Sequence, residues 1–284
     1  ENGKRITGQT TQANGTSVSA RELEIYSSDS VSLFNASNTI TTLNSANTDG
    51  GMSLRDSTGG LILAGDILES GNGDINVRTE SGSLSVGVND ITATGTGSIT
   101  LTGQGIDTSK TIAATSVIDG GSGTITLDGD SSGVTLGGDL TTTHNTNGSV
   151  TIKDATAVSL SNVTTGVNGS LTLGVAAGSE GVGAVTQVSD TKVVTGTVEG
   201  FAERASARAS VDLANLNNEF TQLGNLTTAA LELYSKNTDG LTWVGDVDAA
   251  GTTDITSLGA IDLDTYNLLA TGSTLNITGE GISQ

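Results

Sequence analysis

The sequence predicts an all-β fold, a single-stranded parallel β-helix (β-solenoid) with about 21–26 residues per coil and one irregular excursion. Three observations support this prediction. Short runs alternate apolar and polar residues and end at Gly, Asn or Asp, as strands with one buried face do. A five-residue phrase recurs along the chain. The 284 residues include 40 glycines, no proline, no cysteine and only 2% aromatic residues, so the core has to be aliphatic.

Short strands are predicted in order along the chain, each spanning three to five residues. The alternating runs cover residues 23–25, 31–33, 61–63, 75–77, 84–86 and 134–136. The recurring phrase is Gly, a small or polar residue, and then apolar–polar–apolar. It begins at Gly73, Gly97, Gly123, Gly148 and Gly169, with a looser version at Gly50. The successive spacings of 23, 24, 26, 25 and 21 residues predict one coil per repeat.

Coil stacking explains the composition. Every strand would pair with the coils on either side, which satisfies the backbone without helices. Inward side chains would form ladders of Val, Ile and Leu, while outward Thr and Ser suit strand geometry. Glycine supplies the corners, and a proline would remove a ladder hydrogen bond at almost any strand position.

A longer repeat extends over several coils. The phrase ATGTGSITLTGQGI at residues 93–106 returns as ATGSTLNITGEGI at residues 270–282, with an offset of 176 over its last eight residues. Further matches at an offset of 180 join 38–43 with 218–223, 61–67 with 241–247, and 74–75 with 254–255. We interpret these matches as a module of several coils that occurs twice.

The predicted organisation has three parts. Residues 1–174 form β-helix coils, 175–210 form an irregular excursion or extra-helical insert, and 211–284 form coils that repeat 38–106. Residues 205–213 alternate small or apolar with polar side chains, which favours a strand at re-entry into the solenoid. The alternative is a short helix over the alanine-rich residues 199–209.

Charge and composition restrict the partners. The net charge of −20 argues against nucleic acid and anionic membranes, because phosphate binding needs clustered Lys and Arg, and the sequence offers no basic group larger than a pair such as Arg204 with Arg208. The sequence contains no apolar run of about 18 residues, so it does not predict a membrane-inserted helix. The missing cysteines exclude a disulfide scaffold and a cysteine zinc site. Glu1 opens the sequence without a leader-like segment, as expected of a mature product or an excised piece.

No catalytic, cofactor-binding or metal-binding residue is predicted, and no cofactor. His144 is the only histidine and lies in the turn-like segment THNTNG. Three aspartate pairs have members two residues apart on one strand face and could hold a hard cation, but we interpret them as solvated: Asp128/Asp130, Asp246/Asp248 and Asp262/Asp264. Trp243 stands where Leu63 stands in the first copy, which places it in or near the core. Sequons such as those at Asn14, Asn35, Asn162, Asn168, Asn225 and Asn276 carry little weight.

These repeats resemble the passenger repeats of filamentous-haemagglutinin-type proteins, which are secreted by the two-partner route. The matching residues of the first set are Asn38, Leu43, Leu61, Leu63, Gly65, Asp66, Ile67, Gly73 and Ile75. Those of the second set are Asn218, Leu223, Leu241, Trp243, Gly245, Asp246 and Val247, and a partial third copy spans 136–140 and 148–152. The resemblance covers nearly all of the chain except about 175–210. It implies a right-handed parallel β-helix in a cell-surface or released adhesin.

The function expected is therefore a secreted bacterial cell-surface adhesin or structural fibre segment, a rigid β-helical stalk that mediates attachment. Its partners would be a receptor or glycan on a host or neighbouring cell, or a second copy bound end to end, and an outer-membrane pore during export. One alternative is a self-assembling extracellular filament or surface-layer subunit. Another is a β-helical polysaccharide-degrading enzyme, but the scarcity of Lys, Arg and aromatic residues argues against an enzyme.

Overall fold

The computed structural model describes residues 4–87, 89–108, 117–119, 123–142, 148–272 and 274–284. These residues are all-β and form about 12 turns of a parallel β-solenoid, as predicted. They contain no helix, and so none long and apolar enough to cross a membrane. The chain divides into two compact units, Glu1–His144 and Asn145–Gln284, which are described separately below.

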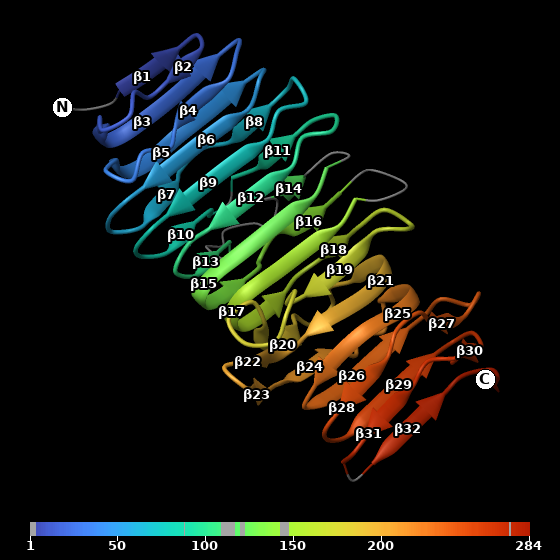
Figure 1. The fold of residues 1–284 in the computed structure, drawn as a ribbon. Coiled ribbons are helices and arrows are strands. Elements are labelled where there is room, and N and C mark those ends of the chain that lie inside the picture. The colour runs from blue at the N-terminus through green and yellow to red at the C-terminus, as the bar shows by residue number, and fades with distance from the viewer. Residues whose placement is uncertain (1–3, 88, 109–116, 120–122, 143–147, 273) are drawn as a thin grey trace. The chain divides into compact units, whose positions relative to one another are not determined.

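Unit 1 is built from three parallel ladders in which each strand pairs with the strand one coil away (Figure 1). The first ladder contains β1 (Lys4–Thr7), β8 (Ile67–Glu69), β11 (Ile91–Ala93), β14 (Val117–Asp119) and β16 (Asp139–Thr141). The second contains β2 (Thr10–Thr11), β4 (Val31–Leu33), β6 (Met52–Asp56), β9 (Ile75–Thr79), β12 (Ile99–Thr102) and the start of β15 (Ile125–Thr135). The third contains β7 (Leu61–Leu63), β10 (Leu84–Ser85), β13 (Ile106–Asp107) and the end of β15. β3 (Ser19–Ser27) and β5 (Thr39–Thr48) run from the third ladder into the first.

Unit 2 repeats this plan. Its first ladder contains β28 (Val247–Ala249) and β31 (Leu268–Ala270). The start of β17 (Val150–Leu160) pairs with β19 (Ser170–Leu173), which lies across two ladders: Leu173 pairs with Gly200 on the side of the first ladder, and Leu171 pairs with Val198 on the side of the third. Its second contains the end of β17, β20 (Val182–Gln187), β24 (Ser210–Leu213), β26 (Ala230–Ser235), β29 (Thr253–Ser257) and β32 (Leu275–Thr278). Its third contains β18 (Val163–Thr164), β27 (Leu241–Trp243), β30 (Ile261–Asp262) and β33 (Ile282–Ser283). β21 (Val193–Phe201) and β25 (Glu219–Thr228) join the third ladder to the first.

The ladders follow the period of the recurring phrase. Ile75 pairs with Ile99, and Ile99 pairs with Ile125, so the spacings of 24 and 26 residues each correspond to one coil. In unit 2, Val150 pairs with Leu171 in the same way. The inward residues are almost all aliphatic and buried. Trp243 is 0% exposed and pairs with Leu223, as Leu63 pairs with Leu43, which confirms its expected place in the core.

Several strands are longer than the predicted three to five residues. β15 and β17 have 11 residues each, because they continue through a corner instead of ending at it. Asp130 and Ser131 in β15 and Asp154 in β17 turn these corners with positive φ angles. In β5, an extra residue at Asn44 does the same work: Leu23 pairs with Leu43, but Glu24 pairs with Ser45. Such bulges bend a strand without ending it.

The two related phrases occupy equivalent places. Residues 93–106 run from the end of β11 through β12 into β13, and residues 270–282 run from the end of β31 through β32 into β33. One detail of the predicted alignment is wrong. Ile255 lies two coils after Leu213, as Val77 lies two coils after Leu33, so its equivalent is Val77 and not Ile75.

The expected excursion over 175–210 is much shorter in the structure. β20 and β21 belong to the parallel ladders, and only β22 (Glu203–Arg204) and β23 (Ala207–Arg208) pair antiparallel. The strand expected over 205–213 forms at β24, but Ala205 and Ser206 are the turn of this hairpin, with φ angles of 49° and 64°. Glu199 lies in β21, so the alternative of a helix there is wrong.

The second module copy begins inside this stretch. Residues 10–18, TTQANGTSV, match residues 185–193, VTQVSDTKV, at an offset of 175. After the hairpin, Val211 matches Val31 at an offset of 180. The hairpin is therefore a five-residue insertion. The rest of the stretch forms a regular coil, which its alanine- and glycine-rich sequence did not reveal.

Candidate functional site

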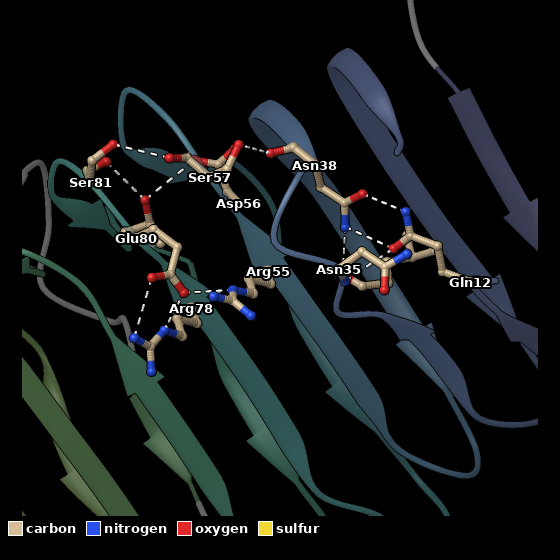
Figure 2. Close-up of polar contacts among 11 residues, drawn as sticks. Gln12, Asn35, Asn38, Arg55, Asp56, Ser57, Arg78, Glu80 and Ser81 are labelled. Carbon is tan, nitrogen blue, oxygen red and sulfur yellow. Dashed lines mark hydrogen bonds and ion pairs between the residues drawn. The ribbon is translucent and has the colours of Figure 1, made fainter. Parts of the chain in front are cut away.

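An amide pair, made of a buried asparagine and a half-buried glutamine, closes one corner of each module copy. Asn38 is 0% exposed, and its side chain uses all four of its hydrogen-bonding positions (Figure 2). Its Oδ1 accepts from the Val18 backbone N–H at 2.8 Å and from Gln12 Nε2 at 2.6 Å. Its Nδ2 donates to the Leu33 carbonyl and to Gln12 Oε1, both at 2.9 Å. This corner is satisfied internally and serves the fold.

The second copy repeats the pair with Asn218 and Gln187. Asn218 Oδ1 accepts from the Val193 N–H and Gln187 Nε2, and its Nδ2 donates to the Leu213 carbonyl and Gln187 Oε1, all at 2.8 Å. Sequence reasoning singled out both asparagines but missed both glutamines. The repeated Thr-Gln at 11–12 and 186–187 is the signal that identifies them.

Asp56 is a buried carboxylate beside this corner. It is 0% exposed, its Oδ1 accepts from the Ile40 N–H at 2.8 Å, and Thr79 Oγ1 donates to its Oδ2 at 3.3 Å. Burial raises the pKa of Asp56 above its ordinary value, although these hydrogen bonds oppose the rise. In the second copy Ser235 takes this place, and its Oγ accepts from the Phe220 N–H at 3.0 Å. The position therefore needs an acceptor and no charge.

Two stacked arginines share one carboxylate on the outside of unit 1. Arg55 pairs with Arg78 in the ladder, and Glu80 Oε1 lies 2.6 Å from the Nε atom of each (Figure 2). Burial opposes ionisation of Glu80, but hydrogen bonds from Arg78 and Arg55 outweigh it and lower the pKa of Glu80. The Arg55 guanidinium also lies over the Phe34 ring, 5.9 Å from its centroid. The cluster holds adjacent coils together and keeps one net positive charge.

The inserted hairpin is held to unit 2 by its two arginines. Arg208 binds Asp248 bidentately, with Nη1–Oδ1 and Nη2–Oδ2 distances of 2.7 and 2.6 Å. Hydrogen bonding by the Arg208 side chain and its positive charge lower the pKa of Asp248, against a smaller opposing effect of burial. Arg204 binds Asp154 and donates to the Ser179 carbonyl. The basic group noted in the sequence is therefore used inside the protein.

A groove crosses the outside of β19, β21 and β25 in unit 2. Its volume is about 340 Å³, and its walls are Glu199, Phe201, Asn225, Thr172 and Val175, with Gly174 and Gly200 between them. Glu199 and Phe201 are two apart on β21, so both point outward. Thr172 Oγ1 donates to Glu199 Oε1 at 3.2 Å. The groove thus combines a partly exposed aromatic ring, a carboxylate and an amide.

A β-bulge sets the position of the amide. Val198 pairs with Leu223 and Gly200 pairs with Leu226, so Gly224 and Asn225 together oppose Glu199. A Cβ on Gly224 would lie 2.9 Å from Glu199 Cβ and 3.0 Å from its Oε2, so the missing side chain leaves room for Glu199. Asn225 is exposed, and its Oδ1 accepts from the Asp246 N–H at 2.9 Å. This bond directs the rest of the amide outward.

The first copy presents a related but different arrangement. Glu24 and Tyr26 stand at the places of Glu199 and Phe201, at an offset of 175. Ser45 stands at the place of Asn225, and the hydroxyls of Tyr26 and Ser45 lie 3.0 Å apart in a hydrogen bond. Asn44 replaces Gly224 at the bulge. The polar group beside this ring is therefore engaged with the ring's own hydroxyl.

The aspartate pairs are used locally. Asp128 Oδ1 accepts from the Asp130 N–H, and Asp262 Oδ1 accepts from the Asp264 N–H, both at 3.1 Å. Within the described ranges, no group of three or more His, Asp or Glu residues is placed to hold a metal ion. His144 lies outside the described residues. Of the sequon asparagines named above, the exposed ones are Asn14, Asn168, Asn225 and Asn276, and the partly exposed ones are Asn35 and Asn162.

Comparison with protein-family models, with curated proteins and with solved structures finds no match to this chain. Its functional interpretation therefore rests on the residues described above.

Proposed function

We propose that this chain is a segment of a secreted bacterial cell-surface adhesin, in which β-solenoid coils form a stalk that mediates attachment. One observation carries the proposal: between the two module copies the core ladder is kept while the outward ladder changes. Val31 and Met52 become Val211 and Leu231 on the inside. On the outside, the successive residues Ser32, Ser53 and Asn76 become Asp212, Glu232 and Asp254.

A constant scaffold with a variable surface suits recognition of other surfaces. Solenoid repeats contact mainly their neighbours, so outward positions can change without altering the fold. Extended polar strips on stacked strands offer broad contact areas, and loops and inserts on a rigid scaffold are where binding residues gather. The acidic strip also favours extracellular solubility over contact with nucleic acid.

The test is attachment of the purified chain. Fluorescent beads coated with it are passed over cultured epithelial cells and over bacterial lawns, and retention under flow is counted. Beads coated with an unrelated soluble protein of similar size and net charge are the control. We expect several-fold greater retention on at least one surface. Retention equal to the control on all of them would reject the proposal.

Two further measurements separate the alternatives. Size exclusion with light scattering is expected to give the mass of one chain, whereas long fibres would favour a filament or surface-layer subunit. Incubation with a panel of acidic polysaccharides is expected to leave their chain length unchanged. Turnover of any of them would favour a polysaccharide-degrading enzyme.

A further inference from the structure

The groove of unit 2 has the chemistry that a sugar ring requires. A hexopyranose has one face of C–H groups and a rim of hydroxyls, so it matches an aromatic ring flanked by hydrogen-bonding groups. Phe201 supplies the ring, Glu199 supplies acceptor oxygens, and Asn225 supplies an amide, around a volume of about 340 Å³. That volume is near the lower end of the range for small-molecule sites.

We propose that this groove binds one residue of a neutral, hexopyranose-containing glycan. The Phe201 ring stacks on the C–H face, the Glu199 carboxylate accepts from sugar hydroxyls, and the Asn225 amide donates to the sugar. This inference rests on the proposed role in attachment and names the ligand class of that role.

Electrostatics selects a neutral ligand. The chain carries a net charge of −20, and Glu199 adds a carboxylate in the groove itself. Uronate or sulfate groups would be repelled by both. The arginines of the hairpin do not offset this charge, because Arg204 and Arg208 are bound to Asp154 and Asp248.

The first module copy provides an internal reference. It keeps the carboxylate and the ring as Glu24 and Tyr26, but Ser45 is hydrogen-bonded to the Tyr26 hydroxyl, and Asn44 adds a side chain where Gly224 has none. The second copy thus differs at two positions. Asn225 replaces a serine that is bound to the ring hydroxyl, and Gly224 leaves room beside the Glu199 carboxylate. Binding is assigned to the second copy, and Tyr26 becomes the matched control for Phe201.

Direct binding is measured first, with the full chain and a panel of maltose, cellobiose, α-1,2-mannobiose and, as the acidic comparison, polygalacturonate, by saturation-transfer difference NMR and titration calorimetry. We expect a dissociation constant on the order of 1 mM for at least one of them, since a single ring and two polar groups contact the sugar. Phe201→Ala should weaken binding at least about tenfold. Glu199→Gln should weaken it roughly threefold to tenfold through loss of the charge-assisted acceptor.

The control variant is Tyr26→Ala, which should bind like the unaltered chain. Circular dichroism and thermal unfolding check that all variants fold, as expected for outward-facing side chains. The inference is overturned if no neutral sugar binds the folded chain, if only polygalacturonate binds, or if Phe201→Ala and Tyr26→Ala behave alike.

Bead attachment in the presence of the bound disaccharide separates this inference from the proposed function. Beads that attach, with no sugar binding or competition, leave attachment standing and reject the glycan site. Sugar binding that depends on Phe201, with beads that never attach, supports the site and rejects the role in attachment.

Discussion

Gly65 shows how a missing side chain can lock two coils together. A Cβ at this position would overlap the carbonyl oxygen of the bulge residue Asn44 in the preceding coil. In the second copy, Gly245 meets the bulge backbone at Gly224 and Asn225 in the same way. The Gly-Asp of LILAGDI and LTWVGDV therefore recurs because each bulge needs a neighbour without a Cβ.

Gly65→Ala is expected to destabilise the chain by about 1–3 kcal/mol, because either the bulge or the following coil has to shift. Chemical denaturation measures the free energy of unfolding. Gly281→Ala is the matched control, since nothing lies within 4 Å of a Cβ built there and its φ lies outside the left-handed region. Equal effects of the two substitutions would contradict the close contact between Gly65 and the bulge at Asn44.

Asp56 gives the fold a pH dependence of unusual sign. Burial raises its pKa in the folded state above the ordinary 3.8, so the fold binds the proton more tightly than the unfolded chain does. The stability this contributes is complete below pH 3.8 and is lost as the pH rises through the folded-state pKa. We expect Asp56→Asn, whose amide can still accept from Ile40, to gain stability relative to the unaltered chain over that interval.

Denaturation at a series of pH values from 3 to 7 measures this difference. Glu80→Gln is the comparison, because the pKa of Glu80 is lowered below its ordinary 4.5 by Arg78 and Arg55 against the effect of burial. Its contribution is present above pH 4.5 and is lost as the pH falls through the folded-state pKa. If the stability difference between variant and unaltered chain changed with pH in the same direction for both variants, the local surroundings of Asp56 and Glu80 would not control the ionisation of these carboxylates.

At the scale of elements, the hairpin β22–β23 adopts a demanding turn with ordinary residues. Two-residue hairpin turns of this kind need positive φ at both central positions, which Asn-Gly meets and Ala205–Ser206 meets with strain. We expect the double change Ala205→Asn and Ser206→Gly to raise stability by about 1 kcal/mol. Denaturation measures it, and Ala207→Gly, outside the turn, should not stabilise. An unchanged midpoint for the double variant would mean that the hairpin opens before the coils unfold.

The elements also show which features a sequence can disclose. Strands such as β9 and β12 were predictable because alternation and a coil-length period agreed. β20 and β21 were not, because Gly183, Gly196 and Gly200 interrupt the apolar pattern while their backbones stay in the ladder. Gln12 and Gln187 were missed because an amide pair has no periodic signature. The groove was missed because a one-residue bulge decides where Asn225 points.

At the scale of the whole molecule, stability is distributed locally. Each strand pairs with the coil on either side, so the free energy is close to a sum of nearest-neighbour terms. We expect Gly65→Ala to speed hydrogen exchange at the amides of β5, β8 and β11, and to leave β29 and β30 unchanged. Mass spectrometry of peptides from both regions tests this, and faster exchange throughout the chain would indicate one cooperative unit instead.

The five residues added by the hairpin also have an evolutionary meaning. The offset between the module copies rises from 175 to 180 across it, yet the ladders on both sides stay in register. Small insertions at a corner of such a chain can therefore arise in evolution without any change in the buried core residues. The same property makes the hairpin tip, at Ala205 and Ser206, a natural position for grafting a foreign epitope or affinity tag.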